Sequence, residues 1–423
     1  MGLWPCSLET LELTLFGMSD AQFVRRVTCR VCGSSELDLV LDYGRMPLAG
    51  GFFPAEDERS RQVFPMNLVR CEDCTLLQVA ETINPETIFS TYSYTSSVNR
   101  MLVAHNVELA STLKEMLPRE GLIVEIGCND GILLKPLVRL DAKVVGVDPS
   151  DVAQRAADEN GWPFVRGYFD RQKASEIQGR FGFADIVVAN NVCAHLDDPN
   201  RMVEGVAKLL RPDGYFVFEV HYQGDLIETG QYDTVYHEHT CYYSLKSLKR
   251  LLNVHGLRIV DVQRIPIHGG SIRVTSVPMA SSPPPSLNVQ QMLEEEADLD
   301  VARFAVFARR HGKLLHDLLA NLRRAGKRIV AYGASGRATI LLNFCSLGNE
   351  FLDYVSDVSP LRYDRVVPGV GVPVLPRERF HEDYPDYALM TAWNYEQEIL
   401  RDEAEFLNKG NAFIVPLPQI RIV

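Results

Sequence analysis

The sequence lacks several features that define common classes of protein. Its 423 residues contain no uninterrupted apolar run near the ~20 residues that a transmembrane helix needs. Residues 1–20 carry acidic side chains and no basic leader, which argues against a secretory signal. Positive charge is not in excess either, and a net charge of −12 disfavours broad binding to nucleic acid or anionic membranes. No solenoid-type repeat is present. We therefore expect a cytoplasmic enzyme that does not bind nucleic acid or a membrane.

The composition predicts several globular domains. Hydrophobic residues make up 46% of the chain and charged residues 23%, which allows a large core. The low-complexity stretch is Ser281–Ser286, whose consecutive prolines predict a stiff extended linker. A long helical pattern, Val289–Arg324, follows it. We predict a tail at 1–18, a Cys-rich module at 19–90, a central domain at 91–285 and a C-terminal domain at 286–423.

Strands and helices alternate in the central region. Apolar segments that predict strands occur at 122–126, 143–147, 184–189 and 214–220, with helical stretches between them. Such alternation predicts a parallel sheet covered by helices on both faces, with ligands at the carboxyl ends of the strands. The alternation starts again at 328–332. The predicted fold class is α/β, with a small N-terminal module and two Rossmann-like domains.

Four of the nine cysteines form two tight pairs. Cys29-x-x-Cys32 and Cys71-x-x-Cys74 are metal-binding knuckles in spacing, and two knuckles supply the four thiolates of a tetrahedral zinc site. Four cysteine ligands leave no open position, so we expect structural zinc. Unrelated buried thiols and a redox pair are the alternatives. The loop 44–52 between the knuckles is long enough to face a ligand.

A glycine turn follows the first strand of the central region. The segment Val124–Gly131 has the pattern E-x-G-x-x-x-G, which differs from the dinucleotide fingerprint G-x-G-x-x-G. It resembles the first motif of class I S-adenosylmethionine-dependent methyltransferases. Asp148 ends the second strand, where a carboxylate can accept hydrogen bonds from two ribose hydroxyls. An ordinary turn is the alternative. The resemblance implies that the cofactor contacts Glu125, Gly127, Asn129, Gly131, Asp148 and Asn190, with Phe169 or Asp170 near the adenine.

Histidine, tyrosine and glutamate gather in Tyr236–Ser244, after the fourth strand, and His195 follows the third. Both segments are expected at the carboxyl-end face. A histidine near its ordinary pKa of about 6.5 is the natural base for an acidic C–H proton. A metal site is an alternative, because strand-like alternation would point His237 and His239 the same way. A buried aromatic cluster is another.

These motifs together resemble the sugar C-methyltransferases of antibiotic biosynthesis, which act on nucleotide-linked 4-keto-deoxyhexoses. The resemblance covers nearly the whole chain after Met18 and includes Gly269-Gly270-Ser271-x-Arg273. It implies a zinc module, a central S-adenosylmethionine domain and a C-terminal domain that helps to bind the nucleotide sugar. Thr240 departs from the family, which often has an aliphatic or aromatic residue there. The resemblance implies that His239 is the base, that His195, Tyr236 and Glu238 surround the sugar, and that Tyr92 or Tyr94 contacts it.

A second glycine loop, Ala331–Thr339, also follows a strand and opens a helix. Backbone N–H groups at a helix N-terminus attract phosphate, and Arg337 adds a positive charge. We predict that the loop binds the diphosphate of a nucleotide sugar, and Asp357 occupies a ribose-acid-like position. An inherited, empty turn is the alternative. The substrate-binding residues predicted here are Gly333, Ser335, Gly336, Arg337 and Thr339.

The leading hypothesis is C-methylation of a nucleotide-diphosphate-linked 4-keto-deoxyhexose by S-adenosylmethionine. Position 3 is favoured over position 5, and the nucleotide is expected to be thymidine diphosphate. The chain is expected to act as a monomer or small homo-oligomer. An RNA methyltransferase with a zinc module and a non-catalytic zinc- and nucleotide-binding scaffold are the rival hypotheses.

Overall fold

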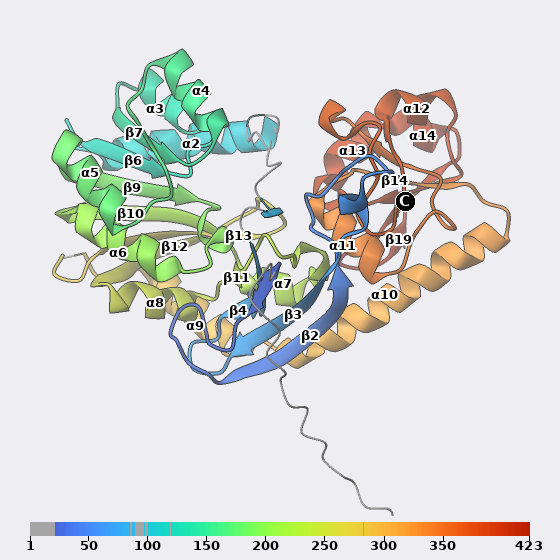
Figure 1. The fold of residues 1–423 in the computed structure, drawn as a ribbon, viewed down its shortest axis with the longest axis horizontal. Coiled ribbons are helices and arrows are strands. Elements are labelled where there is room, and N and C mark those ends of the chain that lie inside the picture. Colours follow the sequence, from blue (N-terminus) through green and yellow to red (C-terminus); the bar gives the residue numbers. More distant parts are fainter. Residues whose placement is uncertain (1–21, 85–86, 89–96, 98–99, 119, 282) are drawn as a thin grey trace, which may run out of the picture.

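A computed structural model describes residues 22–84, 87–88, 97, 100–118, 120–281 and 283–423. The predicted tail at 1–18 and the two substrate tyrosines, Tyr92 and Tyr94, lie outside these ranges. In Figure 1 a central domain and a C-terminal domain stand side by side, and strands of the N-terminal module run beneath them.

The N-terminal module is built on an antiparallel sheet. Its strand order is β11-β4-β3-β2 within the described residues, and β11 comes from the central domain. This shared sheet joins the segment after the predicted base to the Cys-rich module. The elements are β1 (Phe23–Arg25), β2 (Leu37–Met46), η1 (Glu58–Arg61), β3 (Phe64–Cys71), β4 (Leu77–Val79), β5 (Glu81–Ile83) and β11 (Cys241–Tyr242).

The central domain has the predicted α/β architecture. Its sheet runs in the order β12-β13-β10-β9-β6-β7-β8 over the described ranges. Strands β10, β9, β6, β7 and β8 are parallel, and the hairpin β12–β13 is antiparallel at one edge. The strands are β6 (Leu122–Ile126), β7 (Lys143–Asp148), β8 (Phe164–Arg166), β9 (Ala184–Asn190), β10 (Leu210–His221), β12 (Leu257–Ile265) and β13 (Ser271–Pro278).

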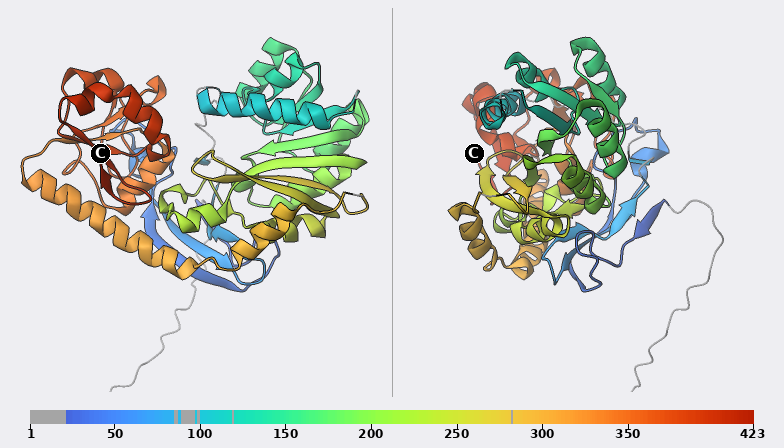
Figure 2. Two further views of the ribbon diagram at one scale, coloured as in Figure 1. Left: turned by 180° about the vertical axis from the view of Figure 1, so that it is seen from behind. Right: turned by 90° about the vertical axis from the view of Figure 1, so that its left-hand side faces the viewer.

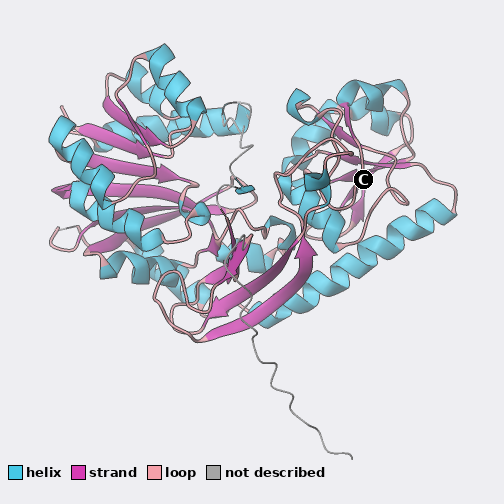
Figure 3. Ribbon diagram, viewed as in Figure 1, coloured by secondary structure: helices cyan, strands magenta, loops and turns pink. Residues whose placement is uncertain are grey.

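Helices cover both faces of this sheet, as Figure 3 shows. Alternate side chains of β6 enter two different cores, since Ile123 packs on one face and Val124 on the other. Parallel strands buried on both faces require such continuous apolar runs. The elements are α2 (Arg100–Met116), α3 (Leu134–Arg139), α4 (Asp151–Asn160), α5 (Arg171–Phe181), η3 (Cys193–His195), α6 (Pro199–Leu209), α7 (Gln223–Glu228), η4 (Tyr232–Thr234) and α8 (Leu245–Val254).

The predicted helical stretch after the proline linker is two helices. Helix α9 (Leu287–Glu296) ends before Asp300, and α10 (Val301–Arg324) starts there because the Asp300 carboxylate accepts a hydrogen bond from Arg303 N–H at 2.9 Å. Helix α9 packs against β12 and α8 of the central domain. Helix α10 leads to the C-terminal domain, as the left-hand view in Figure 2 shows.

The C-terminal domain is a second α/β unit. In the described part of the chain its sheet order is β16-β15-β14-β17-β18-β19, with β19 antiparallel. No helix among the described residues is long and apolar enough to cross a membrane. The elements are β14 (Ile329–Tyr332), α11 (Gly336–Phe344), β15 (Val355–Asp357), η5 (Pro360–Arg362), β16 (Val374–Pro376), α12 (Arg377–Glu382), β17 (Tyr387–Met390), η6 (Trp393–Tyr395), α13 (Glu396–Asp402), α14 (Ala404–Asn408), β18 (Ala412–Val415) and β19 (Arg421–Ile422).

Candidate active site

The four cysteines of the two knuckles converge on one point. All four sulfur atoms lie within 4.8 Å of one another, and the Sγ–Sγ distance is 3.5 Å both for Cys29–Cys74 and for Cys32–Cys71. A zinc tetrahedron with bonds of about 2.3 Å has edges of about 3.8 Å. The thiolate set therefore fits zinc, and its four sulfur ligands make the site structural.

The two knuckles have the same backbone form. The residue after each pair, Gly33 or Thr75, has a positive φ, of 75° and 67° respectively. Its N–H donates to the carbonyl of the first cysteine of its pair, at 2.9 Å in both knuckles. The Thr75 hydroxyl lies 2.7 Å from the hydroxyl of Ser244, the N-cap of α8, which ties the second knuckle to the central domain.

The first glycine turn lies between β6 and α3 and has little room for side chains. Gly127 and Gly131 have φ values of 72° and 75°. A Cβ on Gly127 would come within 2.4 Å of Val192, and one on Gly131 within 2.4 Å of Trp162. Glycine is therefore required at both positions, because the backbone is left-handed and the neighbours are close.

Asp148 faces this turn from the end of β7. Its two carboxylate oxygens accept hydrogen bonds from Asn129 N–H at 3.1 Å and Ser150 N–H at 2.8 Å. A carboxylate can accept about four hydrogen bonds. Both oxygens thus keep capacity for hydroxyl donors, and the side chain is fixed by the backbone on either side.

Two more predicted cofactor residues carry polar atoms without partners among the described residues. The atoms without a partner are Oδ1 and Nδ2 of Asn190, at the end of β9, and Oε2 of Glu125, on β6. Burial, with Asp148 as a second cause, raises the pKa of Glu125 well above its ordinary value. Buried polar atoms of this kind fit a site that a polar ligand completes. Asp170 instead caps α5, accepting from Gln172 and Lys173 N–H groups.

The histidine segment is a turn, so it lacks the strand-like alternation on which the metal alternative depended. His239 N–H donates to the Tyr236 carbonyl at 3.0 Å, which closes a turn over His237 and Glu238. The two histidine rings therefore diverge. His237 packs edge-on against Phe64 of the N-terminal module, and its Nε2 lies 3.0 Å from the Pro65 carbonyl oxygen.

His239 meets His195 and Tyr236. Its ring centroid is 4.6 Å from that of His195 and 4.2 Å from that of Tyr236. The Tyr236 hydroxyl lies 3.2 Å from His239 Nε2, while His239 Nδ1 has no hydrogen-bond partner in the described ranges. His195 Nδ1 lies 2.8 Å from the carbonyl oxygen of Glu238. The structure thus brings three predicted site residues together.

Both histidines favour the neutral form. Burial first, and then the nearby His195, lower the pKa of His239 well below its ordinary value. Burial also lowers the pKa of His195, although the hydrogen bond to Glu238 opposes this. A neutral imidazole has one nitrogen with a lone pair, which is what a general base needs.

The metal alternative for the histidines finds no support in the described part of the chain. The group of three or more His, Cys, Asp or Glu side chains placed to share an ion there is the four-cysteine set. His237 and His239 point toward different neighbours, as shown above. We therefore assign metal binding to the cysteines.

The loop 44–52 packs between the histidine turn and the second glycine loop. Gly50 N–H donates to Glu238 Oε1 at 2.9 Å, so this carboxylate contacts the loop rather than His239. The carbonyl of Ala49 accepts from the Thr339 hydroxyl at 3.1 Å. The N-terminal module therefore contacts both domains at the predicted site.

The second glycine loop repeats the geometry of the first. Asp357, at the end of β15, accepts from Ala334 N–H at 2.6 Å and from Ser359 N–H at 2.7 Å. These hydrogen bonds match those of Asp148. In each case one donor is an N–H of the glycine turn, and the other is the N–H of the residue two positions after the aspartate. Gly333 has φ 102°, and Ser335 caps α11 by accepting from Ala338 N–H at 3.2 Å.

Arg337 and Thr339 make contacts between domains. The Arg337 guanidinium pairs with the fully buried Asp233 of η4 at 3.2 Å and stacks on Trp393, with its carbon 4.5 Å from the ring centroid. Trp393 Nε1 also donates to Asp233, at 2.8 Å. Thr339 is completely buried. Asp233 compensates the charge of Arg337. The sequence pattern did not predict this ion pair.

An ion cluster surrounds the buried Glu219 near the end of β10. Glu219 accepts from Arg273 Nε at 2.8 Å, and His105 Nε2 lies 2.9 Å from both of its oxygens. Arg273 belongs to the Gly-Gly-Ser-x-Arg motif, but the sequence pattern did not predict Glu219 and His105 as its neighbours. The three residues are too far apart in the chain for any local pattern to connect them.

Family models match all three parts of the chain. Residues 29–89 match a family described as "Putative zinc binding domain", residues 100–262 a methyltransferase domain, and residues 266–418 a C-methyltransferase C-terminal domain. The matched order agrees with the order of the predicted parts.

Similar proteins include C-methyltransferase NovU of Streptomyces niveus, 35% identical over 404 residues that cover 93% of this chain and 96% of the relative. A ubiquinone biosynthesis O-methyltransferase of Azorhizobium caulinodans is 34% identical over 125 residues, which cover 28% of this chain and 47% of that protein. The solved structure of the CcbJ methyltransferase from Streptomyces caelestis is 15% identical, with a TM-score of 0.34, and covers 42% of this chain and 90% of that one.

The family models agree with the thiolate set and the glycine turn. S-adenosylmethionine is the cofactor, and the four cysteines are the zinc ligands. The hypothesis of a non-catalytic scaffold is therefore wrong. The chain belongs to the S-adenosylmethionine-dependent C-methyltransferases that carry an N-terminal zinc-binding domain, the family of NovU.

Proposed function

We propose that this enzyme methylates the carbon next to the ketone of a nucleotide-diphosphate-linked 4-keto-deoxyhexose, with position 3 favoured over position 5. The observation that carries the proposal is the contact of His239 with Tyr236 and His195 at the carboxyl-end face. A C-methyltransferase must form a carbon nucleophile, and a ketone makes the adjacent C–H acidic enough for histidine to remove its proton.

The hydrogen bond of His195 limits its role. Because a carbonyl only accepts, His195 Nδ1 must carry the proton that lies toward Glu238. The neutral ring then has only a lone pair at Nε2 and has no second N–H to offer. His195 therefore does not donate to an enolate oxygen unless it gains a proton, and Tyr236 is the better donor.

One of the two proton arrangements that fit the contact between Tyr236 and His239 leaves His239 able to act as the base. His239 Nε2–H donates to the Tyr236 oxygen, which leaves the lone pair on Nδ1, the atom without a partner among the described residues. We propose that the Tyr236 hydroxyl donates to the ketone oxygen in the enzyme–substrate complex. Proton removal by Nδ1 makes the ring cationic, which strengthens the hydrogen bond that Tyr236 gives to the enolate.

The cofactor supplies an electrophilic methyl group when bound. The proposed cofactor contacts are Asp148 with the ribose hydroxyls, the turn around Gly127 with the methionine part, and Asn190 at the end of β9. These residues orient the reacting groups and keep water away from the carbanion. Tyr92 and Tyr94 remain predicted substrate contacts outside the described residues.

The second glycine loop is proposed to hold the nucleotide of the substrate, with thymidine diphosphate expected. The match between the hydrogen bonds of Asp357 and Asp148 supports a nucleoside site at β15. The N–H groups of Gly333 and Ala334 already donate to the Ser356 carbonyl and to Asp357. The N–H groups of residues 335–336, at the start of α11, would therefore be the ones that face the diphosphate. Arg337 would act beside Asp233, so its net contribution to phosphate binding is smaller than an unpaired arginine would give.

Mass spectrometry with a panel of nucleotide sugars tests this function. Purified enzyme is incubated with S-adenosylmethionine and either thymidine- or guanosine-diphospho-4-keto sugars. We expect a mono-methylated thymidine-linked product and none from the same sugars after reduction of the 4-ketone. Equal methylation of the ketone and the reduced sugar would rule out an enolate route.

We expect Asp148→Ala to weaken S-adenosylmethionine binding at least about tenfold, because a hydrogen bond to a charged acceptor is worth about 1.5–3 kcal/mol. Isothermal titration calorimetry measures the change. Asp151→Ala is the control, since Asp151 is an exposed carboxylate close in sequence that pairs with Arg166. Equal affinities of the Asp148 variant and the wild type would remove Asp148 from the site.

In the profile of kcat/KM against pH, we expect the decline on the acid side to begin at an unusually low pH. A general base works in its neutral form, and burial places the pKa of His239 well below the ordinary 6.5. As the pH falls, kcat/KM should therefore stay level through 6.5 and decline only below it, since kcat/KM reports the ionisations of the free enzyme. A decline centred at or above 6.5 would contradict a buried neutral base.

A further inference from the structure

Thr240 contacts the backbone on both sides of His195. Its hydroxyl lies 2.9 Å from the Leu196 carbonyl oxygen and 3.2 Å from that of Ala194. Its N–H also donates to Ala194 at 2.7 Å. Because Thr240 directly follows His239, these bonds link the backbones that carry the two histidines.

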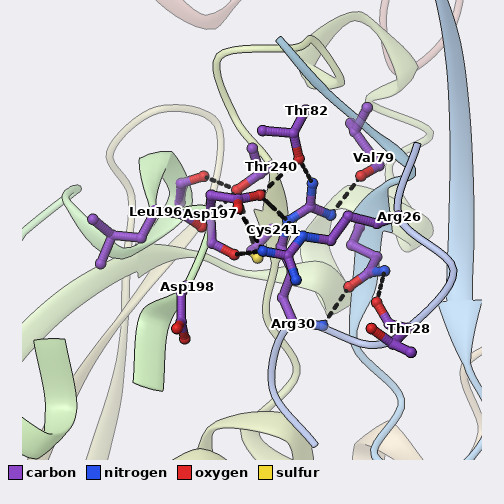
Figure 4. Close-up of polar contacts among 12 residues, drawn as sticks. Arg26, Thr28, Arg30, Val79, Thr82, Leu196, Asp197, Asp198, Thr240 and Cys241 are labelled. Carbon is purple, nitrogen blue, oxygen red and sulfur yellow. Dashed lines mark hydrogen bonds and ion pairs between the residues drawn. The ribbon is translucent and has the colours of Figure 1, made fainter. Parts of the chain in front are cut away.

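Asp197, two residues beyond His195, joins this turn to the N-terminal module. Its Oδ1 accepts from the Thr82 hydroxyl at 2.6 Å, from Arg26 Nε at 3.1 Å and from Arg30 Nε at 3.3 Å. Arg26 also pairs with Oδ2 and donates to the Asp197 carbonyl. Figure 4 shows these side chains converging on Asp197.

Arg30 connects the zinc knuckle to both histidine segments. It lies between the ligands Cys29 and Cys32, and its side chain is 0% exposed. Besides Asp197, its guanidinium donates to the Val79 carbonyl at 2.6 Å, and Val79 N–H donates in turn to the Thr240 carbonyl at 3.0 Å. Arg30 thus contacts Asp197, two residues beyond His195, directly, and it is linked through Val79 to Thr240, the residue after His239.

The charges of Asp197, Arg26 and Arg30 compensate one another and favour a fixed arrangement of the three side chains. Burial alone would favour the neutral acid, but hydrogen bonds from Arg26 and Thr82 and the charge of Arg30 hold the pKa of Asp197 below its ordinary value. A buried arginine that lost this carboxylate would be left partly uncompensated, which is costly. The ion cluster therefore resists rearrangement and holds the His195 turn against the knuckle.

We propose that Arg30, Asp197 and Thr240 are positioning residues, through which the zinc module sets the placement of His195 against His239. The inference rests on the proposed function in one respect, since it takes this histidine pair as the reacting site. It gives the zinc module a task beyond its own folding. Small displacements of reacting groups, on the order of 1 Å, typically cost about 100-fold in rate.

The test compares Thr240→Val with Thr240→Ser. Valine keeps the volume and removes the hydroxyl, whereas serine keeps the hydroxyl. We expect Thr240→Val to lower kcat by roughly tenfold or more with KM and S-adenosylmethionine affinity within about twofold, and Thr240→Ser to restore most of kcat. Equal kcat for the valine and serine variants, with wild-type folding, would overturn the role of the hydroxyl.

A second pair of variants tests the ion cluster. Asp197→Asn is compared with Asp57→Asn, since Asp57 also pairs with an arginine of the N-terminal module, Arg59, but has no contact with the His195 turn. Zinc content should stay at one per chain in both. A lower kcat is expected in the Asp197 variant only. If Asp197→Asn fails to fold, the Thr240 pair decides the proposal.

Nitrogen-15 NMR of the histidine rings provides a measure that needs no substrate. His195→Asn and His239→Asn assign the two rings among the ten histidines. In Thr240→Val we expect the nitrogen-15 chemical shifts of both rings to move toward the values of a mixture of tautomers. In Thr240→Ser we expect these chemical shifts to stay unchanged. Unchanged spectra in the valine variant would overturn the positioning proposal even if the enzyme methylates sugars. Conversely, shifted rings in an enzyme inactive on every 4-keto sugar would overturn the proposed substrate alone.

Discussion

His239→Asn is expected to abolish methylation and to stop hydrogen exchange at the substrate carbon. Asparagine keeps a polar side chain of similar reach but does not accept a proton at neutral pH. Without the base, both processes should fall by at least the ~100-fold that general-base catalysis typically supplies. The measurement is deuterium incorporation from heavy water beside product formation. S-adenosylmethionine affinity should stay near normal, because Asp148 and the turn at Gly127 are intact.

His195→Asn and His237→Asn serve as comparisons. The former removes the ring beside His239 and should slow both steps while the acid limb of the pH profile remains. The latter removes a ring that packs on Phe64 and should affect stability more than exchange. Deuterium exchange at the wild-type rate in His239→Asn would place the base elsewhere, with Tyr236 and His195 as the next candidates.

Cys71→Ser is expected to lose zinc and to destabilise the enzyme strongly. Cys71 and the other knuckle residues Cys29 and Cys74 belong to the same buried core as strands of the central domain, so damage to the site spreads into that core. We expect the melting temperature to fall by about 10 °C or more, from a loss of several kcal/mol. Elemental analysis and calorimetry check both results.

Cys345→Ser is the control for zinc loss. Cys345 is also a buried, free cysteine, but it lies in the C-terminal domain, 3.3 Å from the Tyr232 hydroxyl, and is not a zinc ligand. It should keep one zinc per chain. Full zinc occupancy in Cys71→Ser, or fully active wild-type protein without zinc, would contradict the assignment.

The sequence predicted the elements that depend on local patterns. The apolar segment 122–126 is strand β6, and 184–189 lies within β9, because continuous apolar runs bounded by turns specify buried parallel strands. The knuckle spacing located the zinc ligands, and Asp148 lies at the end of β7 as expected. These features need only neighbours in the chain.

Contacts between distant segments could not be predicted. The ion pair of Arg30 with Asp197 spans 167 positions, and the bond from Thr339 to Ala49 spans 290. The charge of Arg337 suggested a phosphate contact, whereas its compensation by Asp233 depends on how two domains meet. The histidine rings diverge because one backbone hydrogen bond forms a turn, a choice that the residue pattern alone does not make.

The most direct test of the central claim is the position of the new methyl group. The enzyme is supplied with carbon-13-methyl S-adenosylmethionine and a thymidine-diphospho-4-keto-deoxyhexose, and the product is examined by NMR. We predict a one-bond carbon–carbon coupling between the labelled methyl and the sugar carbon next to the ketone, when that carbon is also labelled. A methyl group attached to oxygen, or no labelled sugar at all, would contradict the account.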